Sequence, residues 1–260
     1  MLLDGHTFVV CAYKESAFLE ECIQSLIKQN YKSEVVLYTS TLNDYIDAIC
    51  KKYDVEIFTS DEEPGIGHDW NKSLSCVRTK YATIAHQDDI YLPDYSQKIM
   101  DGFINHKDTL ISFSNYQEWK NNEVLPHGRN LKIKSTLLKI IGSFPKSKRA
   151  RLFSLSLGNI ICCPAVSYNM ELLPGFQFDE GMRTNLDWEA WYRIANLDGR
   201  FHYVSETLMY HRIHEESETT NTISDNTRTK EDKEMFEKFW PSWVANFLMR
   251  FYIKSQDTNN

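Results

Sequence analysis

The stretch TFVVCAYKESAFLEECIQSLIKQNYKSEVVLYTS, residues 7–40, places a helical pattern between two short apolar runs. Residues 7–13 and 33–40 are rich in β-branched and aromatic side chains, which favour strands. Between them, Phe18, Cys22 and Leu26 recur at helical spacing within residues 17–29. A strand, a helix and a strand joined by short connections predict a parallel β-α-β unit.

The same alternation continues to residue 89. Helical patterns at residues 42–53 and 68–79 alternate with strand patterns at residues 55–60 and 81–89. We therefore expect an α/β fold with a mostly parallel sheet flanked by helices. Ligands of such sheets bind at the carboxyl ends of the strands. Tyr13, Ser40 and Asp88 all lie at or just after predicted strand ends, so they predict a binding site there.

The second half of the chain is less regular. It contains strand patterns at residues 109–119, 158–169 and 201–214, and a helical pattern at residues 185–199. A last helix, rich in aromatic residues, is expected from residue 230, with Pro241 kinking or restarting it.

The composition narrows the class of protein. The 260 residues are 42% hydrophobic, which is enough for one large domain or two tightly joined halves. A formal net charge of -7 argues against nucleic acid as the main partner, because phosphate binding requires a basic face. No C-x-x-C pair, basic leader or apolar run of ~20 residues occurs. We expect a cytoplasmic protein, either soluble or peripheral at the inner face of the membrane.

Two adjacent carboxylates, Asp88 and Asp89, end the fourth predicted strand in the sequence HQDD, residues 86–89. One or two carboxylates, completed by substrate phosphates, are a common site for Mg²⁺ or Mn²⁺. Alternatively, the pair ends the strand and caps the turn before Pro93. The residues alone leave both interpretations open.

A second acidic pair, Asp187 and Glu189, lies in the helix predicted at residues 185–199. Side chains two residues apart in a helix point about 200° apart, so at most one should face a shared site. Asp187 is a candidate general base. Alternatively, Thr184 caps this helix and Asp187 only interacts with the helix dipole.

A third cluster, YHRIH at residues 210–214, ends the last predicted strand pattern. His211 and His214 should face opposite sides of a strand, so they are not a ready pair of metal ligands. Arg212 and one histidine are candidates for contact with a diphosphate or a metal.

These motifs together resemble the family-2 glycosyltransferases, which have the GT-A fold. The helix with Leu19, Ser25, Leu26 and Gln29 resembles the family's opening helix. HQDDIYLPDY resembles its Asp-x-Asp-Asp stretch, LDWEAW its acidic helix, and YHRIHEES its closing Y-x-R-x-H-x-x-S motif. Four motifs in the same order over residues 7–217 are more specific than any one of them.

The resemblance implies a metal-assisted, inverting transfer of a sugar from a nucleotide-diphosphate sugar to an acceptor hydroxyl. It favours a UDP-sugar donor and a glycan or lipid-linked acceptor, in polysaccharide, lipopolysaccharide or glycoconjugate synthesis. By this resemblance Asp187 is the catalytic base, and Asp88 and His214 bind Mn²⁺ or Mg²⁺. Asp89 would hold the loop or a metal-bound water. The implied donor-binding residues are Ala12, Tyr13, Glu15, Ser40, Asn71, His86, Gln87, Asp88 and Arg212, with Asp69 as a further candidate.

The chain departs from the family pattern at several positions. His86 replaces the first aspartate of Asp-x-Asp-Asp, and its imidazole is expected to face the ribose. Ser40 stands where an acidic residue near the base is usual, which leaves the identity of the base open. Leu186 replaces the glutamate before Asp187. We expect residues 1–100 to form the nucleotide-sugar-binding half, residues 101–228 the acceptor-binding and catalytic half, and residues 229–260 a C-terminal amphipathic helix and tail.

Some alternatives stay open at this point. The basic segment at residues 129–151 is either a solvated helix and loop or an arm that meets anionic lipid headgroups or a diphosphate. The C-terminal aromatic helix is either core or homodimer interface, or it lies on a membrane that carries lipid-linked acceptors. The whole chain could instead be a non-catalytic sugar-nucleotide binder or membrane-associated scaffold. A nucleotidyltransferase would need an early Gly-rich loop, which CAYKES at residues 11–16 does not supply.

Overall fold

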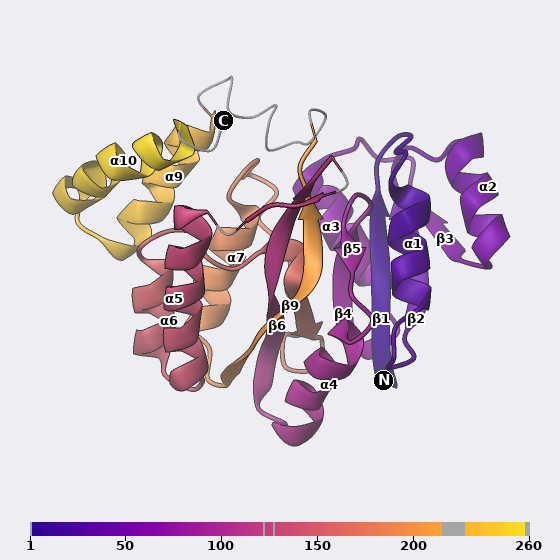
Figure 1. Cartoon of the computed structure of the whole chain (residues 1–260), viewed down its shortest axis with the longest axis horizontal. Helices are drawn as coiled ribbons and strands as arrows, with labels where there is room; N and C mark the ends of the chain where they lie inside the picture. Colours follow the sequence, from indigo (N-terminus) through magenta and orange to yellow (C-terminus); the bar gives the residue numbers. More distant parts are fainter. Residues whose placement is uncertain (1, 122, 127, 215–226, 258–260) are drawn as a thin grey trace.

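The computed structural model describes residues 2–121, 123–126, 128–214 and 227–257. Over these residues, nine strands form one sheet in the order β3-β2-β1-β4-β8-β6-β9-β5, with β7 paired to β6 (Figure 1). The strands are β1 (Leu3–Ala12), β2 (Glu34–Thr39), β3 (Glu56–Thr59), β4 (Thr79–His86), β5 (Ile90–Tyr91), β6 (Thr109–Lys120), β7 (Glu123–Val124), β8 (Val166–Asn169) and β9 (Arg200–Arg212). The helices are α1 (Leu19–Ile27), α2 (Asp44–Tyr53), α3 (Ile66–Ser75), α4 (Tyr95–Asn105), α5 (Arg129–Ser143), α6 (Lys148–Leu155), α7 (Leu186–Ala195), α9 (Thr227–Phe239) and α10 (Ser242–Asp257), with a short 3-10 helix, η1 (Cys163–Ala165). The predicted α/β architecture is confirmed.

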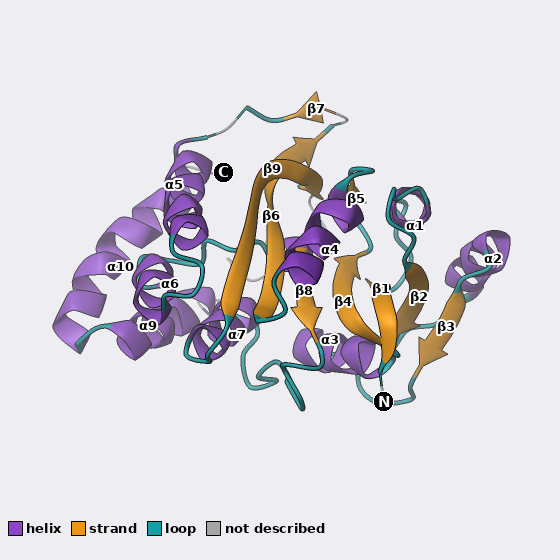
Figure 2. Ribbon diagram, turned by 90° about the horizontal axis from the view of Figure 1, so that it is seen from below, coloured by secondary structure: helices purple, strands orange, loops and turns teal. Residues whose placement is uncertain are grey.

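The strands β3, β2, β1 and β4 are parallel neighbours, as the N-terminal alternation predicts. Alternate residues of β1 point to opposite faces of the sheet. Phe8 and Val10 belong to the core that includes α1, α2 and α4, whereas Val9 belongs to the core that includes α3 and α7. Figure 2 shows helices on both faces of the sheet. Cys11 of β1 is in register with His86 of β4, so their carboxyl ends lie together.

The other half of the sheet is mixed in direction. β8 runs antiparallel to both β4 and β6, while β6 and β9 are parallel. The strand expected at residues 158–169 is limited to Val166–Asn169. Pro164 lies in η1 just before it and has no backbone N–H for a sheet ladder, which explains the late start.

The helix predicted from residue 230 consists of two helices, α9 and α10, because Pro241 separates them. Met235 and Phe236 of α9 and Ala245 of α10 are buried in the same core as Trp188 of α7. This segment is therefore core, one of the two expected alternatives. On α10, however, the side chain of Trp243 is 76% exposed.

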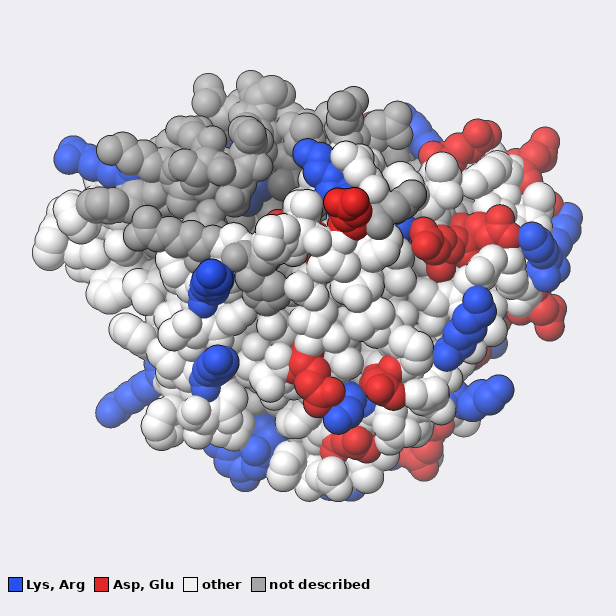
Figure 3. All heavy atoms as spheres, in the orientation of Figure 1, with Lys and Arg blue, Asp and Glu red and all other residues white. Residues whose placement is uncertain are grey.

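Charged side chains of both signs mix on the surface near α1 and α2, at the right of Figure 3. Lys51 pairs there with Asp47, and Lys52 with Glu20. Within the described ranges, the helices are all too short or too polar to cross a bilayer.

Candidate functional site

A cavity of about 600 Å³ opens at the carboxyl ends of β1 and β4. It is lined by eight candidate residues of the sequence analysis: Tyr13, Asp69, His86, Gln87, Asp88, Asp187, His211 and His214. Residues from both halves of the chain therefore meet at one site, where α/β sheets bind their ligands.

Gln87 fixes the HQDD loop against the end of β1. Its Oε1 accepts a hydrogen bond from the Tyr13 backbone N–H at 3.1 Å, and its Nε2 donates to the Tyr13 carbonyl at 3.0 Å. The Cys22 thiol of α1 donates to the His86 carbonyl at 3.2 Å. The His86 ring stacks on Trp70 of α3, with ring centroids 5.3 Å apart. These contacts fix the backbone from which Asp88 projects into the cavity.

Asp89 is fully buried and ties the loop to β9. Its Oδ1 accepts hydrogen bonds from His211 Nδ1 at 2.9 Å and from the Arg212 backbone N–H at 3.0 Å. Burial alone would lower the pKa of His211, but the charge and hydrogen bond of Asp89 outweigh it and raise that pKa to about 9. His211 therefore carries a positive charge at neutral pH.

Arg212 is also buried, and it holds the same loop from another direction. Its Nε donates to the Asp88 carbonyl at 2.9 Å, its Nη2 pairs with Glu21 at 2.6 Å, and its guanidinium lies over the Phe18 ring. Arg212 is not among the residues that line the cavity. The structure thus places its side chain on the loop backbone, away from the position expected for contact with a donor diphosphate.

His214 lies beyond β9, which ends at Arg212, so the expected opposite orientation of His211 and His214 is wrong: both line the cavity. His214 Nε2 lies 2.8 Å from Asp88 Oδ2. Burial works to raise the pKa of Asp88, but this hydrogen bond and the charges of the nearby histidines lower it overall. Glu215 to Ser217 of the closing motif lie outside the described residues.

The residues around Asp88 fit a divalent metal ion. His86, Asp88 and Asp89 each offer a ligand atom, and these atoms lie within 4.8 Å of one another. Among the described residues, His86 Nε2 and Asp89 Oδ2 are buried without a hydrogen-bond partner. Two carboxylates and an imidazole with unused ligand atoms suit Mn²⁺ or Mg²⁺. His86, expected to face the ribose, is therefore a candidate metal ligand beside Asp88 and His214.

Asp187 lies in the first turn of α7. Its Oδ2 accepts a hydrogen bond from Asn159 Nδ2 and its Oδ1 from the Trp188 backbone N–H, both at 2.8 Å. Burial raises the pKa of Asp187, and these two hydrogen bonds only partly oppose the shift. Glu189 pairs with Arg193 at 2.6 Å and does not line the cavity, so one acid of the pair faces the site, as expected.

The alternative in which Thr184 caps this helix is wrong. Asn185 is the N-cap residue of α7, and the Thr184 hydroxyl donates to Glu231 of α9 at 2.7 Å. The Glu231 carboxylate also accepts the backbone N–H groups of Arg183, Thr184 and Asn185, at 2.8, 2.8 and 3.0 Å. A carboxylate from the C-terminal segment therefore holds the N-cap residue and the turn that leads into the helix that carries Asp187.

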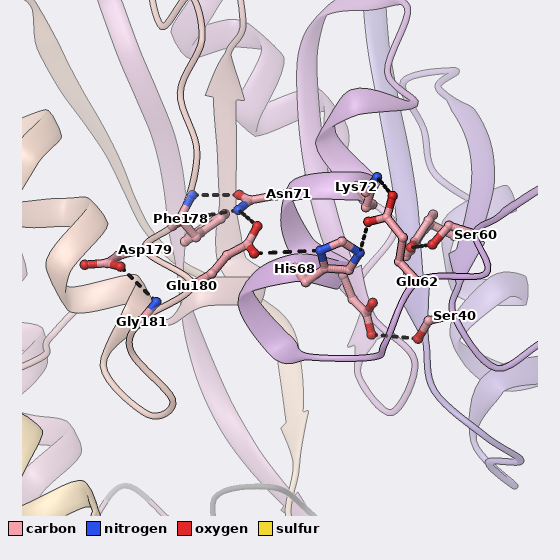
Figure 4. A network of polar contacts seen from close by, with 12 residues as sticks. Ser40, Ser60, Glu62, His68, Asn71, Lys72, Phe178, Asp179, Glu180 and Gly181 are labelled. Carbon is pink, nitrogen blue, oxygen red and sulfur yellow. Dashed lines mark hydrogen bonds and ion pairs between the residues drawn. The ribbon is translucent and has the colours of Figure 1, made fainter.

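Asn71, an expected donor-site residue, joins α3 to the loop before α7 (Figure 4). Its Oδ1 accepts from the Phe178 N–H at 2.7 Å, and its Nδ2 donates to the Phe178 carbonyl at 3.1 Å and to Glu180 at 2.8 Å. All polar atoms of this side chain face the loop. The structure thus gives Asn71 a position that supports the site from behind, and it does not line the cavity.

Three further expected donor-site residues, Ala12, Glu15 and Ser40, are also absent from the lining. Ala12 is fully buried, and Glu15 is exposed. Ser40 donates a hydrogen bond to Asp69 Oδ2 at 3.0 Å (Figure 4). Asp69 itself is buried and does line the cavity, so α3 brings an acidic group close to the end of β2.

The sequence did not single out several residues that line the cavity, including Trp70, Lys134, Asn159 and Arg228. Of these four, only Lys134 could have been suspected from the sequence, because it lies in the basic segment at residues 129–151. In the same segment, Arg151 is fully buried elsewhere and donates to the carbonyls of Leu197 and Gly199. Neither expected alternative, a solvated helix and loop or an arm that meets anionic groups, therefore describes the whole segment at residues 129–151.

The sequence model of the family described as Glycosyl transferase family 2 matches residues 7–171. The uncharacterized glycosyltransferase MJ1057 of Methanocaldococcus jannaschii is 25% identical over 214 residues, which cover 79% of this chain and 69% of that protein. The glycosyltransferase GlyA of Streptococcus pneumoniae is 26% identical over 129 residues, covering 47% of this chain. The matched region is only 18% of GlyA.

Two solved structures are similar in fold. TarS of S. aureus, residues 1–349 in complex with UDP, matches with a TM-score of 0.65 at 13% identity, over 96% of this chain and 70% of that chain. The mannosyltransferase PcManGT of Pyrobaculum calidifontis, in complex with GDP-Man and Mn²⁺, matches with a TM-score of 0.66 at 15% identity, over 90% and 63% of the two chains. At such identities the likeness is one of fold.

Proposed function

The chain belongs to glycosyl transferase family 2, and from this premise we propose that it transfers a sugar from a UDP-sugar to an acceptor hydroxyl with inversion. Its fold is the GT-A fold that the sequence predicts. One observation carries the proposal: a single cavity brings Asp88 and His214 together with Asp187, from three separate motifs.

The donor side of the proposal rests on the HQDD loop. Asp88, Asp89, His86 and His214 would hold Mn²⁺ or Mg²⁺, which when bound offsets the negative charge of the departing diphosphate. Gln87 and Arg212 fix the loop, so these side chains need little rearrangement when the donor binds. Without the ion, Asp89 raises the pKa of His211 to about 9, which favours positive charge in the same region. The complexes of similar folds with UDP, and with GDP-Man and Mn²⁺, support this assignment.

On the acceptor side, Asp187 is the proposed general base. As the acceptor oxygen attacks the anomeric carbon, its proton passes to the Asp187 carboxylate. The bond from the anomeric carbon to the diphosphate oxygen breaks on the opposite face, and UDP leaves with the bonding electrons. A single displacement inverts the configuration. Asn159 and the Trp188 N–H hold the carboxylate in place, and its raised pKa suits proton transfer near neutral pH.

We place this reaction in the cytoplasm, in the synthesis of a polysaccharide, lipopolysaccharide or glycoconjugate, with a glycan or lipid-linked acceptor. The exposed aromatic side chains of α10, Trp243 and Phe247, support a peripheral contact with the membrane that carries such acceptors.

Binding and hydrolysis measurements test the proposal. Calorimetric titration with UDP, GDP and ADP, each with and without Mn²⁺, should give tightest binding for UDP with Mn²⁺. Incubation with a panel of UDP-sugars and Mn²⁺ should then release UDP slowly, by transfer to water, and NMR should show a sugar of inverted anomeric configuration. A protein that binds UDP but releases none from any UDP-sugar would be a binder and not a transferase.

A further inference from the structure

Two cationic side chains, Lys134 of α5 and Arg228 of α9, line the cavity beside Asp187. Both lie close enough for their charges to act to lower the pKa of Asp187, and Arg228 also acts to lower the pKa of Lys134. They come from two helices that are far apart in the chain. Neither helix contributes a residue to the HQDD loop or to its supports.

These cations are incompletely paired. Lys134 Nζ donates to the Tyr116 hydroxyl at 3.4 Å, which is long for a hydrogen bond. Arg228 Nε is buried without a hydrogen-bond partner among the described residues. Burial lowers the pKa of Lys134, so its charged form is held there at a cost in free energy. Both side chains are partly buried, and a cation that is partly removed from water gains from an anionic partner.

The cavity's own carboxylates do not supply that partner in full. Asp187 is the carboxylate next to both cations, and its two oxygens already accept hydrogen bonds from Asn159 and Trp188. Glu118 also acts on Lys134 from outside the lining, so the described lining supplies Asp187 as the carboxylate that the two cations share. The other acidic lining residues are Asp88, which pairs with His214, and Asp69, which accepts a hydrogen bond from Ser40.

We propose that Lys134 and Arg228 bind a phosphate group of the acceptor, so that the substrate which receives the sugar is a phosphorylated compound. This inference rests on the proposed function and names its acceptor class. A phosphate carries up to two negative charges and several acceptor oxygens, which suits an ammonium and a guanidinium together. Bound there, it holds a neighbouring hydroxyl of the same molecule against Asp187. It also offsets the two cations that act to lower the pKa of Asp187, which makes this carboxylate a stronger base.

The variants Lys134→Met and Arg228→Met test this subsite, with Lys134→Gln as a second form in case the methionine perturbs folding. Lys139→Met is the matched control, because Lys139 is exposed on the same helix. Thermal unfolding establishes that each variant is folded. Calorimetry then measures UDP binding with Mn²⁺, which should change less than twofold in all variants.

The probe of the subsite is glycerol 3-phosphate, titrated into the protein saturated with UDP and Mn²⁺, with glycerol as the neutral comparison. We expect binding to the wild type and to Lys139→Met, at least tenfold weaker binding to the Lys134 and Arg228 variants, and none of glycerol. Loss of UDP affinity in these variants would assign the cations to the donor diphosphate. Equal probe binding in all proteins, or none in the wild type, would leave them as counterions of Asp187, and either result overturns the proposal. If UDP itself fails to bind, the proposed donor is wrong, and the same titration on the ligand-free protein still decides the phosphate subsite.

Discussion

Glu231 binds Thr184 twice, through the backbone N–H at 2.8 Å and through the side-chain hydroxyl at 2.7 Å, and both hydrogen bonds end on Oε2. The same carboxylate accepts the N–H groups of Arg183 and Asn185. Of these N–H groups, the one of Asn185 belongs to the N-cap of α7, and the other two lie in the turn before it. A negative charge at a helix start also favours the helix dipole. The C-terminal segment thus fixes the start of the helix on which Asp187 lies.

We expect Glu231→Gln to lower the free energy of unfolding by about 1–3 kcal/mol, because an amide cannot accept four hydrogen bonds and some buried donors lose their partner. It should also lower kcat for sugar transfer more than it raises KM for the donor, since α7 carries Asp187 and the HQDD loop is untouched. Chemical denaturation and steady-state kinetics measure both. Glu234→Gln, at a half-exposed position on the same helix, is the control. Equal stability of the two variants would contradict this role of Glu231.

The stability difference between wild type and Glu231→Gln should also depend on pH. Burial works to raise the pKa of Glu231, but its hydrogen bonds to Thr184 and the neighbouring backbone outweigh this and lower it below 4.5. A carboxyl whose pKa is lower in the folded state stabilises the fold above its unfolded pKa, and this contribution is lost as pH falls through the folded value. Urea denaturation between pH 7 and pH 3 should show the difference shrinking below about pH 4.5. A difference that stays constant over this range would mean that the charge of Glu231 plays no part.

The N-terminal half of the fold could be predicted because its information is local. Helical spacing in α1 and β-branched runs in β1 and β2 specify each element, and short connections specify parallel neighbours. The second half depends on contacts between distant segments. The limit of β8 at Val166 and the division of the C-terminal helix at Pro241 follow from single prolines, whose effects are local, but the docking of α9 on α7 through Glu231 leaves no periodic pattern in the sequence.

In the candidate site, too, some residues could be predicted from the sequence and others could not. Asp88 and Asp187 could be placed because one follows a strand and the other opens a helix, and both positions face the carboxyl edge of a sheet. Arg212 and Asn71 were expected at the donor, yet their side chains are occupied by Glu21 and by Phe178, which are far away in sequence. A motif identifies the residue type at a position, but the direction of its side chain is decided by partners that only the fold brings near.

Removing the carboxylate of Asp88 should separate metal-dependent from metal-independent nucleotide binding. In Asp88→Asn we expect UDP to bind at least tenfold more weakly than to wild type with Mn²⁺ present, and with similar affinity in the presence of a chelator. An amide is a poorer ligand than a carboxylate for a hard cation. Calorimetry measures both affinities, with the exposed Asp61→Asn as control. The same loss with and without Mn²⁺ would show that Asp88 acts on the nucleotide or the loop and not through a metal.

The exposed Trp243 provides a test of membrane contact that leaves the core intact. Removing residues 230–260 would also remove Glu231 and the buried Met235 and Phe236, so a point variant is preferable. We expect the wild type to float with vesicles that contain anionic lipid, and Trp243→Ser to float less than half as well, because an interfacial Trp is lost. Leu42→Ser, at an exposed apolar position before α2, should float like wild type. Equal flotation of both variants would exclude α10 as the contact.

Asp187→Asn should lower the rate of sugar transfer by about 100- to 10,000-fold and leave UDP affinity unchanged, since a general base typically supplies a factor of that size.

Because burial raises the pKa of Asp187, the folded state binds this proton more tightly than the unfolded state does, and the ionised carboxylate opposes folding above the folded pKa. The variant removes this penalty, but its amide can keep only one of the two accepted hydrogen bonds, so its stability at pH 7 should stay close to that of wild type. For the same reason, kcat of the wild type should fall on the acidic side with an apparent pKa above the ~3.9 of a free aspartate. Measurement of kcat from pH 4 to pH 8 checks this, and a variant with wild-type rates at every pH would show that another group takes the proton.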